Sequence, residues 1–181
     1  MDQELVLIAT NIEVKEICNH YKDDIIDFYF NTFNPNNGQY SLVYNNMEFH
    51  NAIAPLLEDA MHEFFYLGPK TQQNYINVYV QSNDKYYGGT IHNHFRTASL
   101  SSVFYYDLPE SGGELDIYYP HLEEKQFVID RIPVEENVLY MFPYWLYHCP
   151  VEQQSDNYRI SFNYDYKCRE RPMLKKTGSM W

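Results

Sequence analysis

Apolar residues in the first third of the chain recur at helical spacing. Between about Val14 and Phe30 they stand three or four residues apart, which predicts one amphipathic helix. A second apolar stripe predicts another helix from about Phe49 to Phe65, which Gly68-Pro69 would end. A short apolar run before both helices, Leu5 to Ala9, predicts a strand.

The pattern changes after about residue 70. Short runs rich in β-branched and aromatic residues now follow one another, separated by turn residues such as Ser111-Gly-Gly113 and Pro143-Tyr-Trp145. They predict eight strands: Tyr75 to Val80, Thr90 to Phe95, Leu100 to Tyr106, Glu114 to Tyr119, Phe127 to Ile129, Asn137 to Phe142, Tyr147 to Val151 and Arg159 to Tyr166. Many short strands after two helices favour a mainly β protein with N-terminal helices. Its core would be a jelly-roll, or double-stranded β-helix, with the helices packed on one sheet.

Length and composition agree with this fold class. A chain of 181 residues without repeats or linkers predicts a single domain of 1–181. It would comprise a helical support (about 1–70), a β-helix core (about 71–166) and a tail (167–181). Aromatic residues make up 18% of the chain, which suits β-structure and a wide cavity lined by side chains.

Charge and cysteine content narrow the functional classes. The net charge of −12 gives no indication of nucleic-acid binding, which needs clustered Lys and Arg to neutralise phosphates. The basic segment Arg169 to Lys176 is interpreted as a solvated tail. Three widely spaced cysteines, Cys18, Cys149 and Cys168, form neither a disulfide framework nor a CxxC pair. Without a signal peptide or membrane span in the sequence, we expect a cytoplasmic protein that does not associate with membranes.

Histidines provide the strongest chemical signal. His92 and His94 stand two residues apart in a predicted strand, so their imidazoles would point from the same face. His148 follows His94 by 54 residues and begins another predicted strand. Imidazole nitrogens are common ligands of Fe(II), Zn(II) and other transition metals, and His148 could close a metal site with the first pair. Arg159, 11 residues further on, offers a forked cation to a carboxylate bound beside that metal.

This order of motifs resembles that of the Fe(II)/2-oxoglutarate-dependent oxygenases. The likeness is greatest to the prolyl-hydroxylase-like members and to small oxygenases of this kind from bacteria and phages. It covers about residues 70 to 166. The matching segments are Ile91-His-Asn-His-Phe95, Ser99 to Pro109, Ser111-Gly-Gly-Glu-Leu115, Leu139-Tyr-Met-Phe-Pro143 and Arg159-Ile-Ser-Phe-Asn163.

The resemblance implies a role for each matching residue. His92 and His148 would bind iron, Arg159 would pair with the distal carboxylate of 2-oxoglutarate, and Ser161 would hydrogen-bond the same group. With Fe(II), 2-oxoglutarate and O2, the protein would hydroxylate a substrate and release succinate and CO2. Tyr79 and Asn77, on one face of the strand before the histidine pair, are candidate contacts of the cosubstrate. Core packing or a structural hydrogen bond would explain them equally well.

The third metal ligand stays open at this stage. His94 occupies the position at which the larger family has Asp or Glu, and three imidazoles leave the site one negative charge short. We expect His94 to be the ligand. Alternatively, His94 turns away and water or a nearby acid takes its place; the acids are Asp84, Asp107, Glu114 and Asp116. Of these, Glu114 fits better as a turn residue or as a partner of a ligand.

Two other functions remain as alternatives. Three imidazoles with an open fourth position also make a zinc-hydroxide site, as in a zinc hydratase or hydrolase. A non-catalytic β-barrel binding protein would keep the fold without the metal. Arg159 and Ser161 favour the oxygenase, because zinc-hydroxide chemistry does not need a buried carboxylate clamp. The sequence favours a small-molecule or peptide substrate without identifying it, and it leaves the oligomeric state open.

Overall fold

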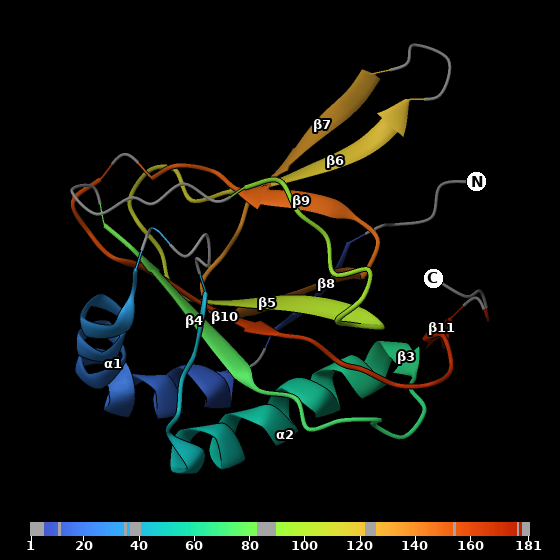
Figure 1. Cartoon of the computed structure of the whole chain (residues 1–181), viewed down its shortest axis with the longest axis horizontal. Coiled ribbons are helices and arrows are strands. Elements are labelled where there is room, and N and C mark those ends of the chain that lie inside the picture. Colours follow the sequence, from blue (N-terminus) through green and yellow to red (C-terminus); the bar gives the residue numbers. More distant parts are fainter. Residues whose placement is uncertain are drawn as a thin grey trace.

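The computed structural model describes residues 6–10, 12–34, 36, 41–82, 90–121, 126–153, 155–176 and 178. These residues form three layers, in which two helices cover one face of a large sheet and a smaller sheet covers its other face (Figure 1). The predicted strand residue Leu5 and the acid Asp84 lie outside the described residues.

Both predicted helices are confirmed. They are α1 (Ile12–Thr32) and α2 (Met47–Phe64). The side chain of Asn46 caps α2 by accepting a hydrogen bond from the backbone N–H of Phe49 at 3.0 Å. The predicted end near Phe65 is confirmed to within one residue, but Gly68-Pro69 lies beyond β3 and does not itself end the helix. The helix ends at Phe64, because the next residues adopt an extended conformation as β3 (Phe65–Tyr66) and pair with β11 (Met173–Leu174).

The large sheet has the order β1-β8-β5-β10-β4-β2 among the described residues. Its strands are β1 (Leu7–Thr10), β2 (Leu42–Val43), β4 (Ile76–Gln81), β5 (Leu100–Asp107), β8 (Val138–Pro143) and β10 (Arg159–Tyr164). The small sheet has the order β7-β6-β9, with β6 (Leu115–His121), β7 (Gln126–Ile132) and β9 (Tyr147–Pro150). All pairs are antiparallel, and strands far apart in sequence lie side by side, as β10 does between β4 and β5.

The predicted fold class, mainly β with two N-terminal helices and a jelly-roll core, is therefore confirmed. Seven of the eight strands predicted after residue 70 correspond to strands of the structure. The exception is Thr90 to Phe95. Only His92 forms a β-bridge there, and residues 95–97 turn away, so this segment is not a continuous strand.

Two apolar clusters hold the layers together. One lies between the helices and the large sheet, where the fully buried ring of Phe162 contacts those of Phe49, Phe104 and Tyr106. The other lies between the two sheets and includes Tyr105 and Phe142. Two functional candidates lie on the side of this second cluster: Ser161 stands opposite Tyr105, and the ring of His148 contacts that of Phe142. In the described part of the chain, neither helix is apolar enough over its length to cross a bilayer.

Candidate metal centre

His148 lies on β9, the strand of the small sheet that is nearest to the His92 segment. One edge of β9 pairs with β6, so that His148 stands opposite Ile117. Along its other edge, His148 N–H donates to the carbonyl of His92 at 2.9 Å, and His92 N–H donates to the carbonyl of His148 at 3.1 Å. Residues directly opposite each other in an antiparallel pair project from the same face. This pair of bonds therefore brings the two imidazoles together.

His94 reaches the same place by a different route. Its N–H donates to the carbonyl of Tyr144 at 2.7 Å, and its own carbonyl accepts from the N–H groups of Thr97 and Ala98 at 3.0 Å each. The chain thus turns directly after His94. The convergence of His92 and His94, which the sequence analysis derived from alternation along a strand, depends instead on one bridge and one turn.

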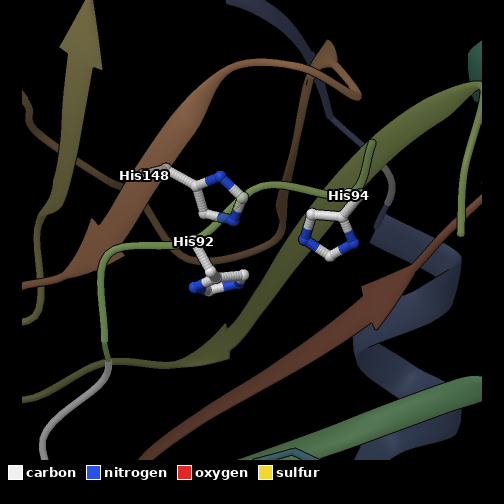
Figure 2. A group of neighbouring side chains, drawn as sticks. All are labelled: His92, His94 and His148. Atoms are coloured by element: carbon white, nitrogen blue, oxygen red, sulfur yellow. The ribbon is translucent and has the colours of Figure 1, made fainter. Parts of the chain in front are cut away.

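The three imidazoles form a compact cluster (Figure 2). Each offers one nitrogen, and these nitrogens all lie within 4.8 Å of one another. The ring centroids of His92 and His148 are 4.4 Å apart, and the rings of His94 and His148 are stacked at 5.2 Å. His148 is buried, with 3% of its surface exposed, and the other two are half-buried. The ring of Phe142 packs against His148 with centroids 4.5 Å apart.

In each ring, the Nδ1 atom has a hydrogen-bond acceptor beside it. The acceptor for His92 is the carbonyl of Thr90 at 2.7 Å, and for His148 it is the carbonyl of Leu146 at 3.0 Å. For His94 it is Oδ2 of Asp165 at 2.7 Å. Carbonyl and carboxylate oxygens only accept, so each Nδ1 carries a proton, and Nε2 is the nitrogen that could bind a metal in the neutral ring. Metal-binding histidines have this arrangement in general.

Burial favours the neutral form of His148 and His92. Burial, followed by the neighbouring His92 and His94, holds the pKa of His148 well below its ordinary value. Burial is also the main cause that lowers the pKa of His92. Since a metal binds neutral imidazole, these two rings need not lose a proton at neutral pH before binding. The donor set fits a divalent transition metal such as Fe(II) or Zn(II), with coordination positions left open for other ligands.

Arg159 lies between the two sheets and is almost completely buried, with 1% of its surface exposed. Its guanidinium donates to Oε1 of Gln81 at 2.8 Å and to the hydroxyl of Tyr105 at 3.1 Å. Its charge also reaches β9, where it opposes the rise in the pKa of Cys149 that burial and Asp116 cause. Gly113 lies so close that a Cβ there would be 3.3 Å from Cδ of Arg159. The glycine of the Ser-Gly-Gly turn therefore makes room for this arginine.

The buried Arg159 has no carboxylate partner among the described residues. The described ion pairs all involve other side chains, and Nε of Arg159 is buried without a hydrogen-bond acceptor. Isolating a charge from water is costly unless an opposite charge compensates for it. This arrangement is typical of a site that receives an anionic ligand.

The other predicted cosubstrate residues, Ser161, Tyr79 and Asn77, lie on β10 and β4 at different distances from Arg159. Ser161 is buried on β10, opposite Tyr79 of β4 and Tyr105 of β5. The ring of Tyr79 lies 5.5 Å from the guanidinium carbon of Arg159. Asn77, further along the same face of β4, donates to the carbonyl of Tyr75 at 3.4 Å.

Three of the acids considered as third ligands lie among the described residues, and none of the three belongs to the histidine cluster. Asp107 pairs with Lys22, Asp116 pairs with Arg131, and Glu114 lies in the turn before β6, outside the three-histidine group. The carboxylate that does contact a clustered ring is Asp165, which the sequence analysis missed. Asp165 is two residues after Asn163, in the same alternation as Arg159 and Ser161. This spacing could have identified it from the sequence as a residue on the same face. Gln81 and Tyr105 were also missed, because only the strand register brings them to Arg159.

Comparison with known proteins extends the interpretation of this geometry. No protein-family model matches the chain, and no curated protein does either. Solved structures do match. A prolyl-4-hydroxylase of Pseudomonas putida gives a TM-score of 0.58 at 13% identity, over 92% of this chain and 89% of its own. SnoN, a non-heme alpha ketoglutarate dependent epimerase from nogalamycin biosynthesis, gives 0.58 at 13% identity, over 97% and 86%. SnoK, a carbocyclase from the same biosynthesis, gives 0.56 at 9% identity, over 94% and 81%.

The chain has the fold of the 2-oxoglutarate-dependent oxygenases. This fold supports more than one outcome, since the similar structures include a hydroxylase, an epimerase and a carbocyclase. Function must therefore be argued from the residues of the site.

The first prediction concerns the metal ligands. His148→Ala removes the most deeply buried of the three donors. We expect the affinity for Fe(II), measured anaerobically by competition with a chelator, to fall by more than the roughly 100-fold typical of losing an outer hydrogen-bond partner. His20→Ala, at an exposed position on α1, is the matched control and should bind like the unaltered protein. Equal affinity of the two variants would remove His148 from the site.

The second prediction concerns pH and the metal-free protein. The unfolded chain protonates His148 near its ordinary pKa of about 6.5, whereas the folded chain does so only at lower pH. As the pH falls below that value, the unfolded state binds more protons, so the free energy of unfolding decreases. Urea denaturation with chelator present, between about pH 7 and pH 5, should show a smaller decrease for His148→Gln. An identical pH dependence in both proteins would contradict the buried neutral ring.

Proposed function

We propose that this protein is an Fe(II)- and 2-oxoglutarate-dependent oxygenase that acts on a small molecule or a peptide. The observation that carries the proposal is the buried guanidinium of Arg159, which has no carboxylate partner among the described residues and lies in the inter-sheet layer that also contains His148. A three-histidine metal site alone would fit several chemistries. A three-histidine site combined with the buried guanidinium of Arg159 favours an anionic ligand that binds the metal and the guanidinium together.

The residues divide this task between them. His92, His94 and His148 would hold the metal through Nε2, and Arg159 would pair with the distal carboxylate of 2-oxoglutarate, assisted by the hydroxyl of Ser161. Gln81 and Tyr105 hold the guanidinium in place through its two terminal nitrogens. When bound, Fe(II) and 2-oxoglutarate would allow O2 to oxidise the substrate, with release of succinate and CO2. Phe142 and the apolar inter-sheet cluster limit the access of water to this space.

The surface around the ligands supports an apolar contact with substrate. Phe95 directly follows His94 and is 63% exposed, and its ring contacts that of Tyr144 at 5.7 Å. Trp145, on the turn that leads to β9 and His148, is also exposed. Large exposed rings beside a candidate metal site are typical of a binding surface. This feature is compatible with a small molecule or a peptide.

Three imidazoles around zinc, as in a hydratase, remain the second candidate. The cluster itself supports it, because three neutral nitrogen donors with an open position make a catalytic zinc site. Arg159 separates the two functions. A zinc-hydroxide enzyme has no cosubstrate carboxylate with which to neutralise this buried charge. Such an enzyme would also have no reason to bind 2-oxoglutarate.

The third prediction tests the clamp. Arg159→Ala should weaken 2-oxoglutarate binding to the Fe(II)-loaded protein under anaerobic conditions by roughly 30-fold or more, the effect of truncating one partner of a buried charge pair. Arg159→Lys should recover only part of the affinity, because an ammonium does not form the forked contact. In air, the unaltered protein should convert 2-oxoglutarate to succinate, slowly when its substrate is absent.

The controls separate the clamp from the metal and from folding. Arg131→Ala removes an exposed arginine of the small sheet and should leave 2-oxoglutarate binding unchanged. Fe(II) affinity should be the same in Arg159→Ala as in the unaltered protein. If Arg159→Ala binds 2-oxoglutarate as tightly as the unaltered protein does, the clamp and the oxygenase assignment are both wrong.

A further inference from the structure

Asp165 is the one carboxylate, among the residues that the structure describes, that is hydrogen-bonded to a ring of the histidine cluster. Its Oδ2 lies 2.7 Å from Nδ1 of His94, and the two side chains are 25% and 16% exposed, respectively. The contact bridges 71 positions of sequence. It is not a local turn contact, and the fold must position both residues to form it.

The backbone holds Asp165 firmly in this position. The residue directly follows β10, and the next residue, Tyr166, exchanges two backbone hydrogen bonds with Leu100 at 2.8 and 3.1 Å. Because Asn163 stands opposite Val103 in the same strand pair, the register places Asp165 opposite Ser101. Ser101 belongs to the alternate positions of β5 that face the small sheet, as Val103 does. Asp165 is thus the last inward position in the row that begins with Arg159.

The charge of Asp165 is not neutralised by a cation within the described residues. Its described ion-pair contact is with His94, and its second oxygen, Oδ1, is buried without a hydrogen-bond partner. In the described part of the chain, the carboxylate therefore has no strong electrostatic partner apart from the His94 ring.

This placement addresses the missing charge of a three-histidine site. A site with two histidines and one carboxylate brings one negative charge to the metal, whereas three neutral imidazoles bring none. Here the carboxylate of Asp165 contacts Nδ1 of His94, so the His94 ring would separate it from a metal bound at Nε2. A carboxylate that accepts the Nδ1 proton of a ligating histidine fixes the ring orientation and makes Nε2 more basic. Such a contact transmits part of the carboxylate's charge to the metal.

We propose that Asp165 is the positioning residue of the metal centre. It fixes His94 with Nε2 toward the metal and supplies, through the imidazole, the negative charge that a directly bound carboxylate would otherwise supply. This inference rests on the metal binding in the proposed function, and it goes beyond it by assigning a role to a residue outside the ligand set.

The fourth prediction compares three substitutions of Asp165. Asp165→Asn keeps an oxygen that accepts the Nδ1 proton but removes the charge, and Asp165→Ala removes both. We expect Asp165→Asn to weaken Fe(II) binding by about 10- to 100-fold, and Asp165→Ala to weaken it at least as much. Asp165→Glu keeps the charge and should recover part of the affinity. Chelator competition under anaerobic conditions gives these values without any need for turnover.

The reduction potential of the bound iron gives a second readout, which a purely structural role would not change. Negative charge near a metal stabilises its higher oxidation state, so Asp165→Asn should shift the midpoint potential to a more positive value. Asp130→Asn makes the same change of charge on the exposed face of β7. It should leave both the affinity and the potential unchanged.

A double substitution tests the coupling between the two residues. His94→Asp places a carboxylate beside Asp165, and their mutual repulsion should weaken metal binding. Adding Asp165→Asn to His94→Asp removes that repulsion, so the double variant should bind Fe(II) more tightly than His94→Asp alone. Additive effects of the two substitutions would contradict the proposed coupling.

The outcomes distinguish this inference from the proposed function. If His148→Ala abolishes Fe(II) binding but Asp165→Asn changes neither affinity nor potential, Asp165 has no such role and the metal site stands. If affinity falls in Asp165→Ala but not in Asp165→Asn, Asp165 only orients the ring, and the charge assignment is wrong. If no histidine variant alters Fe(II) binding, the metal site and this inference are both wrong.

Discussion

Two backbone hydrogen bonds between His92 and His148 are the contact on which the candidate site depends. They join a segment without regular strand structure to β9, whose other edge is fixed by β6. Because the pair is antiparallel and directly opposed, both imidazoles project to the same side. His94 is then positioned by its own bond to Tyr144, and Asp165 by the end of β10. Each of the three candidate ligands is thus held in place by a backbone hydrogen bond.

The inter-sheet layer combines two features that are costly to bury. One is the Arg159 guanidinium, held by Gln81 and Tyr105 without a described carboxylate partner. The other is the cluster of three imidazoles. Desolvation favours the neutral form of two of them, His92 and His148. A divalent ion and a guanidinium would together make a strongly positive interior within a chain of net charge −12. Such an interior selects a dianionic ligand, and this is the physical basis of the proposed cosubstrate.

Periodicity predicted most of the fold, because helix and strand patterns reflect which face of each element is buried. The α1 and α2 stripes and seven later strands were recognised in this way. The predicted strand at Thr90 to Phe95 was wrong, because its shape is set by bridges to β9 and Tyr144 and not by its own alternation. The short strand β3 after α2 was not predicted for a similar reason, since it pairs with a strand more than 100 residues away.

The sequence by itself determined the residue types of the site: three histidines, a later arginine and a serine in a fixed order on β-rich segments. Chemistry limits which side chains bind metals or carboxylates, so these candidates can be read without coordinates. Only the tertiary structure decided which of them meet, that Asp165 contacts His94, and that Gln81 and Tyr105 hold Arg159. The reason is that strand register and chain turns bring together residues separated by 54 to 78 positions, and no local pattern encodes those pairings.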